Sequence, residues 1–345
     1  MSITVTLQPS GRSFTVQRDE AILAAAIRQG IGLPYGCRDG ACGSCKCKVL
    51  EGRVLHGAHQ FKALSIDEEE GGFALTCCAA PQTDVVLEAR TVAGVGEMPV
   101  RRMPARVMHI TKPAPDVAIV KLQLPANDAL RYHAGQYVDV LLPSGSRRSY
   151  SMANAPHTQG TTPWIELHIR HLSGGVFSDQ VFGTMKEKDI LRLEGPFGSF
   201  FLRDDSLKPI VLLASGTGYA PIKALIEHLR FKHIDRQVVL YWGCRTLADL
   251  YAHHEVLALA AITDQTPLLH YLPVLSEALP SDGWTGRTGL VHQAVMADFP
   301  DLSGHQVYAC GAPVMVDAAR RDFSLRCGLP ADEFFADAFT SAADQ

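Results

Sequence analysis

The chain has 345 residues, of which 47% are hydrophobic and 20% are charged. Its length exceeds what one ordinary hydrophobic core serves, and its composition is that of a globular protein rather than a disordered segment or a coiled coil. Lys and Arg number 32 against 36 Asp and Glu, giving a formal net charge of −4. This balance lacks the basic excess that binding to a phosphate backbone demands, so nucleic acid is excluded as an expected ligand.

The apolar runs of the chain are short. None approaches the roughly 20 residues that a membrane-spanning helix needs, so no integral membrane segment is expected. The first residues alternate like a strand and lack the basic start and apolar block of an export signal. Four of the nine cysteines lie between Cys37 and Cys47, which in such a chain favours metal or redox chemistry over disulfides. We therefore expect a cytoplasmic protein.

The N-terminal region contains a mixture of strands and one helix. Residues 3–16 alternate around a Pro-Ser-Gly turn and predict two strands, and residues 19–29 predict a helix rich in Ala, Ile and Leu. A loop at 34–46 holds three cysteines, and further strands are expected at 47–50 and 85–89. These elements predict a compact α+β domain.

The cysteines of this region have a specific spacing. Cys37, Cys42 and Cys45 are separated by four and two residues, and Cys77 and Cys78 follow further along. This is the ligand spacing of a plant-type [2Fe-2S] cluster. A structural zinc site is the alternative, but zinc motifs usually pair two short knuckles rather than a triplet and a distant fourth ligand. Spacing leaves Cys77 and Cys78 as alternatives, because only one of two neighbouring side chains in an extended segment would face the cluster.

The segments YGCRDGACGSCKCKVLEG and LTCCAAP resemble plant-type ferredoxin domains. The resemblance implies an α+β fold of the β-grasp type. It matches the last cluster ligand to Cys77 and leaves Cys78 outside the ligand set. The metal ligands implied by the resemblance are Cys37, Cys42, Cys45 and Cys77.

The middle of the chain contains short alternating segments separated by Gly and Pro turns, which predict an antiparallel barrel. One of these segments, residues 147–151, offers a cation for a pyrophosphate, an aromatic ring for stacking and a hydroxyl. Downstream, the pair Gly174-Gly175 can open a helix whose N-terminal amides receive phosphate. Two phosphate-binding elements in one domain indicate a nucleotide cofactor.

The pattern Arg148-x-Tyr150-Ser151 with Gly174-Gly175-x-x-Ser178 resembles the FAD-binding signature of the ferredoxin-NADP reductase superfamily. The resemblance implies that Tyr150 stacks on the isoalloxazine ring and that Ser151, a catalytic candidate, lies near its reactive nitrogen. Arg148 and the segment from Gly175 to Ser178 would hold the pyrophosphate. FAD is preferred over FMN because the ferredoxin part comes first in the chain. The remaining candidates for cofactor binding in this region are His168, Ile169, Arg170 and Val176.

From Pro209 onward, strand-like runs alternate with helical runs, which predicts a doubly wound α/β sheet with parallel strands. The first strand ends in a glycine-containing turn that fits a phosphate cradle before a helix. A later strand ends in a second glycine-containing turn before a helix. The residues singled out at these two places are Gly216, Thr217, Gly218 and Pro221 at the first, and Cys310 and Gly311 at the second.

These two turns together resemble the nicotinamide domain of the same superfamily. The resemblance implies that Cys310 lies where hydride crosses to the flavin, which makes it a catalytic candidate, and that the C-terminal aromatic Phe339 lies near the flavin. A buried structural thiol is the alternative for Cys310. Arg245 would suit the 2′-phosphate of NADPH and Asp249 the free ribose of NADH. Resemblance to members with the ferredoxin domain first favours NADH, with NADPH left open.

The predicted organisation is a multidomain chain. Its parts are a ferredoxin domain over 1–93, a linker over 94–102, an FAD-binding barrel over 103–202 and an NAD-binding α/β domain over 203–345.

NADH gives two electrons as hydride, whereas a [2Fe-2S] cluster accepts one at a time, so a flavin must stand between them. We therefore predict an NADH-dependent reductase that passes electrons through FAD and the cluster to a partner protein. The resemblance covers almost the whole chain and includes reductase components of oxygenases and reductases that serve a CDP-6-deoxyhexose dehydrase. The phrases LASGTGYAPIK and FFADAF favour the second group. The alternative is a redox-sensing or scaffold module without turnover, against which the intact nicotinamide site argues.

Overall fold

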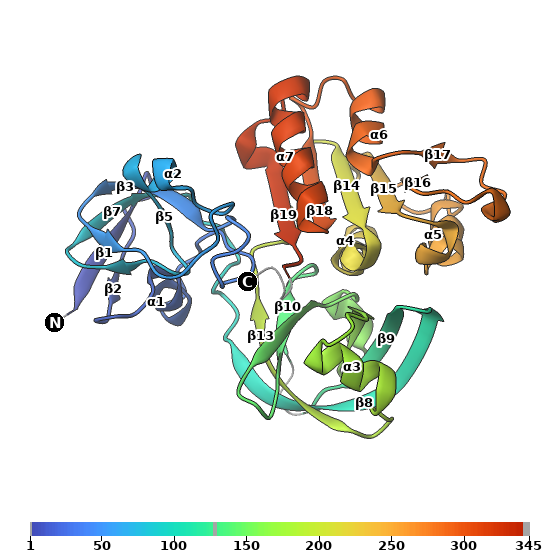
Figure 1. The fold of residues 1–345 in the computed structure, drawn as a ribbon, viewed down its shortest axis with the longest axis horizontal. Coiled ribbons are helices and arrows are strands. Elements are labelled where there is room, and N and C mark those ends of the chain that lie inside the picture. The colour runs from blue at the N-terminus through green and yellow to red at the C-terminus, as the bar shows by residue number, and fades with distance from the viewer. Residues whose placement is uncertain (1, 127–129, 341–345) are drawn as a thin grey trace. The chain divides into compact units, whose positions relative to one another are not determined.

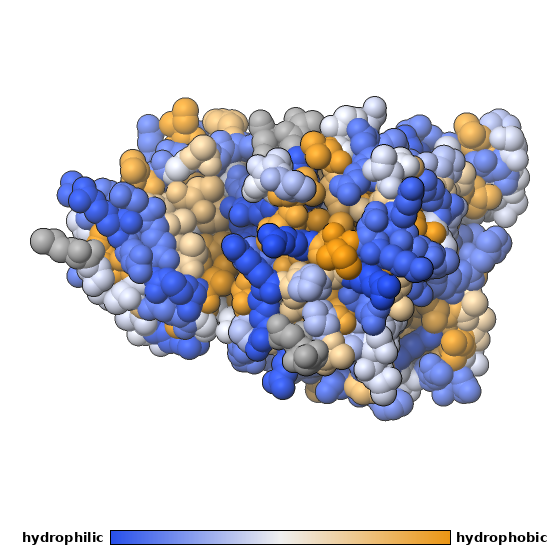
Figure 2. Space-filling view, turned by 90° about the horizontal axis from the view of Figure 1, so that it is seen from below, coloured by the Kyte–Doolittle hydropathy of each residue, from blue (hydrophilic) through white to orange (hydrophobic). Residues whose placement is uncertain are grey.

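The computed structural model describes residues 2–126 and 130–340. Its contacts divide the chain into two compact units, residues 2–99 with 338–340 and residues 100–337 (Figure 1). Over the described part of the chain, none of the helices has the length and apolar character that crossing a membrane requires. On the face drawn in Figure 2, hydrophobic residues are interspersed with hydrophilic ones, as on most protein surfaces.

The first unit is built on a five-stranded sheet in the order β2-β1-β7-β3-β5. The strand β1 pairs with β2 as an antiparallel hairpin and with β7 in parallel, and β3 pairs antiparallel with β7 and β5. The elements are β1 (Ile3–Gln8), β2 (Ser13–Val16), α1 (Ile22–Arg28), β3 (Lys46–Glu51), β4 (Val54–Leu55), α2 (Ile66–Glu70), β5 (Phe73–Leu75), β6 (Ala80–Pro81) and β7 (Val85–Glu88).

The core of this unit follows from the two periodicities of its sequence. Val5 and Leu7 of β1 alternate with exposed polar residues, so one face of the sheet is buried. Helix α1 buries Ile22 and Leu23 and two of the alanines that follow them, Ala25 and Ala26, and these small side chains let the helix backbone approach the sheet closely. The cysteine-containing loop connects α1 to β3 and has no regular secondary structure.

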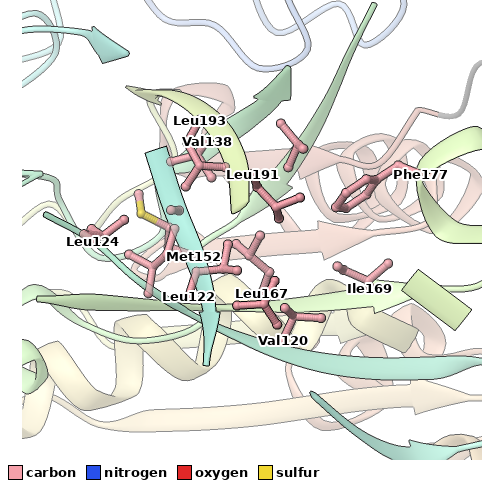
Figure 3. Packing of buried hydrophobic residues seen from close by; sticks show 14 of the residues in the cluster. Val120, Leu122, Leu124, Val138, Met152, Leu167, Ile169, Phe177, Leu191 and Leu193 are labelled. Atoms are coloured by element: carbon pink, nitrogen blue, oxygen red, sulfur yellow. The ribbon is translucent and has the colours of Figure 1, made fainter. Parts of the chain in front are cut away.

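The second unit contains two six-stranded sheets, of which the first is antiparallel in the order β11-β10-β13-β8-β9-β12. An antiparallel bridge between Met152 and Leu167 joins the chain after β11 to β12, which connects the two edges. Figure 3 shows apolar side chains gathered inside this sheet, among them Leu122, Leu167 and Leu193. The elements are β8 (Arg101–Ala114), β9 (Val117–Gln123), β10 (Tyr137–Leu141), β11 (Arg147–Ser151), β12 (Trp164–Arg170), α3 (Val176–Gly183) and β13 (Ile190–Phe197).

The second sheet of this unit has the order β17-β16-β15-β14-β18-β19, and the pairings from β17 through β14 to β18 are parallel. Helix α4 lies against β14 and α7 against β18 (Figure 1). The elements are β14 (Ile210–Ser215), α4 (Tyr219–Phe231), β15 (Val238–Cys244), α5 (His253–Ala260), β16 (Leu269–Leu275), β17 (Arg287–Thr288), α6 (Val291–Asp298), β18 (Gln306–Gly311), α7 (Pro313–Cys327) and β19 (Phe334–Ala338).

The strand order of this sheet reverses between β14 and β18. From β14 the chain proceeds through β15 and β16 to the β17 edge, and it then returns to the other side of β14 with β18. In an open parallel sheet, ligands bind outside the carboxyl ends of the strands at such a reversal. We therefore expect the residues that follow β14 and β18 to bind a ligand.

Candidate functional site

The cysteine loop wraps its own backbone around sulfur atoms. The backbone N–H of Cys37 donates to Sγ of Cys42 at 3.4 Å, and that of Asp39 donates to Sγ of Cys37 at 3.4 Å. Gly40 has φ of +71°, and a Cβ placed there would lie 2.8 Å from Sγ of Cys78. A side chain at this position is therefore disfavoured both by backbone strain and by the neighbouring sulfur.

The thiols of this region lie in contact with one another, Cys37 with Cys42, and Cys77 with both Cys45 and Cys78. The hydrogen bond between the first two thiols lowers the pKa of Cys42 to about 5 and raises that of Cys37. Among residues 2–126 and 130–340, no three His, Cys, Asp or Glu side chains converge as ligands of one ion. A mononuclear zinc site needs four ligands around one ion, whereas a [2Fe-2S] cluster takes two thiolates on each iron. The paired thiols fit the cluster.

Cys77 and Cys78 lie in a turn and not in an extended segment. The backbone N–H groups of Cys78 and Ala79 both donate to the carbonyl oxygen of Leu75, at 3.0 and 2.8 Å. The alternation of side chains along a strand therefore does not apply, and the two Sγ atoms lie 3.5 Å apart. The expectation of an extended segment at Cys77 and Cys78 was wrong, because these residues form a turn, and the choice of Cys77 as the ligand stays a prediction.

The end of β11 presents the residues predicted to bind the flavin. The ring of Tyr150 is half-buried and lies 5.4 Å from that of Phe177 in α3, and Arg148, two residues earlier, lies on the same face of the strand. Burial raises the pKa of the Tyr150 hydroxyl, so the phenol stays neutral. A half-buried ring, a guanidinium and the N-terminus of α3 are groups that can hold a flavin and its pyrophosphate.

The turn before α3 uses its predicted residues in different ways. Gly174 has φ of +81° and is exposed, and Val176 begins the helix with its side chain largely in solvent. The hydroxyl of Ser178 is buried and donates to the carbonyl oxygens of Leu172 and Gly175. In this structure Ser178 holds the turn in shape, and the amides of Gly174 and Gly175 donate within it, to Asp179 and to the carbonyl oxygen of Leu172.

Of the three candidates on β12, the structure brings two to polar surroundings. The side chain of Ile169 is fully buried in the hydrophobic core, so only its backbone could meet a cofactor. The guanidinium of Arg170 pairs with Asp116 at 2.9 Å, and its Nη1 lies 3.2 Å from where a Cβ on Gly216 would be. Arg170 therefore extends from the antiparallel sheet to the turn after β14.

His168 belongs to a buried polar network. Its Nδ1 lies 2.7 Å from the hydroxyl of Tyr251, and its Nε2 lies 3.0 Å from a carboxylate oxygen of Glu166. Lys223 of α4 contacts the same carboxylate at 3.2 Å and Glu227 at 2.7 Å. Burial opposes ionisation of Glu166, but the His168 hydrogen bond and the Lys223 charge outweigh it, so the pKa of Glu166 falls to about 2. His168 thus joins β12 to Tyr251, and Glu166 joins β12 to α4 through Lys223.

The ends of β14 and β18 touch each other. In the parallel register Ala214 lies opposite Cys310, and the hydroxyl of Ser215 accepts the N–H of Ala312 at 2.9 Å. A Cβ on Gly218 would lie 2.2 Å from the carbonyl oxygen of Cys310, and one on Gly311 would lie 2.3 Å from the hydroxyl oxygen of Ser215. Both glycines are therefore required by close backbone approach.

The turn after β14 leads directly into a helix. Residues Gly216–Gly218 form one 3₁₀ turn, and α4 continues from it with Pro221 buried in its first turn. The indole Nε1 of Trp242 donates to the carbonyl oxygen of Gly216 at 3.0 Å, which fixes the turn. Thr217 is buried in the turn. The N-terminus of α4 is in this way presented at the strand-order reversal.

Ser151, Cys310 and Asp337 come together from three distant segments. The hydroxyl of Ser151 donates to a carboxylate oxygen of Asp337 at 3.1 Å, and both side chains are buried. Burial raises the pKa of the Cys310 thiol, and the neighbouring Asp337 charge raises it further, so the thiol stays neutral. Sequence reasoning missed Asp337, although a lone acidic residue within the apolar run FFADAF is a signal of a buried carboxylate. Phe339 follows β19 in the other unit, so its place near the flavin stays a prediction.

The two residues considered for nicotinamide specificity pair with each other. Nε of Arg245 lies 3.2 Å from Asp249, and the Arg245 side chain remains about half exposed. Asp116 lies 3.9 Å from the same guanidinium. Two carboxylates therefore already compensate the charge of Arg245.

Three family descriptions match the chain. Residues 5–82 match the 2Fe-2S iron-sulfur cluster binding domain, residues 104–202 the oxidoreductase FAD-binding domain and residues 212–321 the oxidoreductase NAD-binding domain.

Relatives and solved structures extend over nearly the whole chain. The chain is 42% identical to the CDP-6-deoxy-L-threo-D-glycero-4-hexulose-3-dehydrase reductase of Yersinia pseudotuberculosis, covering 98% of this chain and 99% of the relative. It is 35% identical to the phenol hydroxylase P5 protein of Acinetobacter pittii, covering 100% and 96%. The crystal structure of the Amycolatopsis cytochrome P450 reductase GcoB superposes with a TM-score of 0.79 at 33% identity, covering 99% of each chain.

These matches agree with the clustered thiols and with the buried group of Ser151, Cys310 and Asp337 beside the strand-order reversal. The chain therefore belongs to the NAD(P)H-dependent flavo-iron-sulfur reductases, oxidoreductases that combine 2Fe-2S, FAD-binding and NAD-binding domains in one polypeptide.

Proposed function

We propose that this chain accepts hydride from NADH beside Ser151, Cys310 and Asp337, and delivers electrons singly, by way of four cysteine ligands, to a separate acceptor protein. The observation that carries the proposal is the convergence of these three buried side chains at the ends of β11, β18 and β19, next to the strand-order reversal. FAD, when bound, supplies the conversion between two-electron hydride chemistry and single-electron transfer.

Each residue of the hydride site has a distinct part. The N-terminus of α4 and the turn Gly216–Gly218 bind the dinucleotide phosphates through backbone amides. The thiol of Cys310 is small and neutral, so it packs against the nicotinamide ring and positions it without adding a charge. The hydroxyl of Ser151 is held by Asp337, which fixes its direction and keeps a proton acceptor within hydrogen-bond reach.

The ligands proposed for the cluster are Cys37, Cys42, Cys45 and Cys77. Support comes from the pairing of Cys37 with Cys42 and of Cys45 with Cys77, which supplies two thiolates for each iron. The backbone amides that donate to sulfur in this loop would also stabilise the negative charge of the cluster.

The finer architecture is part of the proposal. The first unit would be a β-grasp ferredoxin domain over 1–93, followed by a linker over 94–102. The antiparallel sheet would be a closed FAD barrel over 103–202, supported by the Met152–Leu167 bridge between its edge strands. The NAD-binding α/β domain would then occupy 203–345. A cytoplasmic location stays a prediction.

We propose NADH as the electron donor. Arg245 is the cation that we expected to meet the 2′-phosphate of NADPH. It is already paired with Asp249, so a 2′-phosphate would have to displace a carboxylate. A free ribose would instead find the Asp249 carboxylate as a hydrogen-bond acceptor. NADPH remains the second candidate, because the guanidinium of Arg245 is half exposed.

The acceptor proposed first is a dehydrase that acts on a CDP-6-deoxyhexose, because the 42% identical relative from Yersinia is named as the reductase of such an enzyme. An oxygenase is the second candidate, favoured by the phenol hydroxylase protein and the cytochrome P450 reductase among the relatives. Purified dehydrase and oxygenase components, added separately to the reductase and NADH, should distinguish them. Product formation with the dehydrase alone is the expected result.

Turnover itself is tested without a natural partner. The reductase loaded with FAD and iron should oxidise NADH and reduce ferricyanide and cytochrome c in steady state. If the fully loaded protein consumes no NADH with either acceptor, the reductase assignment fails and the sensing or scaffold alternative gains.

A further inference from the structure

Cys78 stands among the cluster cysteines without an assigned role. Its Sγ lies 3.5 Å from Sγ of Cys77. Two thiolates bound to one tetrahedral metal ion with bonds of about 2.3 Å lie roughly 3.8 Å apart. The two neighbouring sulfurs are therefore as close together as two ligands of the same metal ion.

The backbone holds the thiol of Cys78 in this place. Its N–H donates to the carbonyl oxygen of Leu75 at 3.0 Å, and its own carbonyl oxygen accepts the N–H of Gly57 at 3.1 Å. Sγ of Cys78 lies against Gly40, in the middle of the loop between Cys37 and Cys42. The thiol thus faces the cysteine loop and is anchored on both sides of its peptide.

Cys47 shows what a cysteine outside this group looks like. It lies within β3, opposite Ala74 of β5, and is buried in the sheet. Cys78 by contrast is half-buried, in a turn, and in contact with another thiol. The position of Cys78 is that of a ligand and not that of a core residue.

We propose that Cys78 is a reserve ligand of the [2Fe-2S] cluster, able to take the place of Cys77 on the iron that Cys77 shares with Cys45. The inference rests on the proposed cluster site. In the exchange one iron–sulfur bond to Cys77 breaks and one to Cys78 forms. The proton that Cys78 gives up passes to the released Cys77 thiolate, and no electron is gained or lost. For this exchange only the turn that holds Cys77 and Cys78 has to move, because their two Sγ atoms start 3.5 Å apart.

The test compares alanine variants, since alanine offers no oxygen ligand. Cys77→Ala, Cys78→Ala and the double variant are reconstituted anaerobically with iron and sulfide, with Cys47→Ala as a control in the same unit. We expect Cys78→Ala to match the wild-type iron content and spectrum. Cys77→Ala should keep more than half of the iron with a shifted electron paramagnetic resonance spectrum. The double variant should fall about tenfold below it.

Two outcomes overturn the reserve role. In the first, Cys77→Ala loses its iron and contains as little as the double variant. In the second, the double variant keeps its iron and contains as much as Cys77→Ala. Loss of iron from Cys78→Ala alone also contradicts it, since Cys78 would then be the resident ligand. FAD content and flavin bleaching by NADH show that the second unit of each variant is folded, and the iron content of Cys47→Ala shows whether loss of a buried thiol by itself disturbs the first unit.

Alkylation gives a second readout. In the loaded wild-type protein, iodoacetamide should modify Cys78 and spare Cys77, and in loaded Cys77→Ala it should spare Cys78. Modification of Cys78 to the same extent in both proteins counts against ligation. Cys42→Ala distinguishes a failure of the proposed cluster site from a failure of the reserve role of Cys78. If Cys42→Ala keeps its cluster, the proposed site itself is wrong, whereas loss of the cluster in both Cys42→Ala and Cys77→Ala refutes only the reserve role.

Discussion

The cysteine loop and the proposed hydride site are built in opposite ways. Three of the proposed cluster ligands lie within one short irregular loop, whose path depends on glycines such as Gly40 with positive φ. The hydride site instead takes Ser151, Cys310 and Asp337 from strand ends that are far apart in the chain. In the loop, backbone N–H groups donate to the sulfur atoms. At the hydride site, two sheets determine the positions of the side chains.

This difference predicts different responses to substitution. A cluster ligand is covalently required, so its removal should abolish the cofactor and everything downstream of it. A side chain at the hydride site contributes one interaction to an arrangement that the two sheets maintain without it, so its removal should slow the reaction and leave the cofactor bound.

Cys42→Ala gives the largest expected effect. Cluster absorbance should disappear and cytochrome c reduction should fall at least about 100-fold, since even residues behind metal ligands cost 10- to 100-fold. Flavin reduction by NADH should continue at the wild-type rate. Cys327→Ala, which removes a buried thiol at the end of α7, is the control and should change neither. An unchanged cytochrome c rate in Cys42→Ala would refute the electron route through the cluster.

The buried network around Glu166 should show how firmly the sheets hold the hydride site. The pKa of Glu166 is lowered to about 2, so its ionised form stabilises the fold. The contribution is fully present above the ordinary glutamate pKa and is lost as the pH falls toward 2. We expect Glu166→Gln to cost on the order of 3 kcal/mol at pH 7 in urea denaturation, with the difference narrowing below pH 5.

The exposed Glu187, which pairs with His109 on the surface, supplies the matched control for Glu166. Glu187→Gln should change stability by less than about 1 kcal/mol at any pH. A stability difference for Glu166→Gln that stays constant between pH 7 and pH 3 would mean that the carboxylate charge is not what stabilises the network.

Ser151→Ala should slow flavin reduction by NADH roughly 10- to 100-fold, because it removes the hydroxyl that Asp337 orients. FAD content and cluster absorbance should stay at wild-type levels. Ser151→Ala combined with Asp337→Asn should be little slower than the slower single variant, since the two residues act as one unit. Stopped-flow absorbance measures each rate, with Ser146→Ala in the exposed hairpin as control. Multiplicative losses in the double variant would show that the two side chains act independently.

Asp249→Ser gives the smallest expected effect. It frees Arg245 for a 2′-phosphate, so the ratio of kcat/KM for NADPH to that for NADH should rise about tenfold, the value of one charge-assisted hydrogen bond. Asp264→Ser, on an exposed loop, should leave the ratio unchanged. If the ratio does not move in Asp249→Ser, the specificity is set elsewhere.

The sequence predicted the cysteine loop better than the hydride site. Ligand spacing along one loop is local, so Cys37, Cys42 and Cys45 could be read directly, and the glycines at 216, 218 and 311 were visible as turns after strands. Asp337 was missed because its partner Ser151 belongs to a different sheet, and the two residues meet only where the two sheets come into contact. Ile169 was placed at the site because a linear motif does not reveal which face of a strand is buried. The relation of Cys77 to Cys78 was misjudged because a turn was taken for a strand.

The order of electron transfer tests the central claim most directly. The loaded wild-type protein is mixed anaerobically with NADH in a stopped-flow instrument, and flavin and cluster absorbance are followed together. We predict that the flavin band bleaches first and that the cluster band follows, with the flavin phase unchanged in Cys42→Ala. A cluster band that bleaches before the flavin band would contradict it.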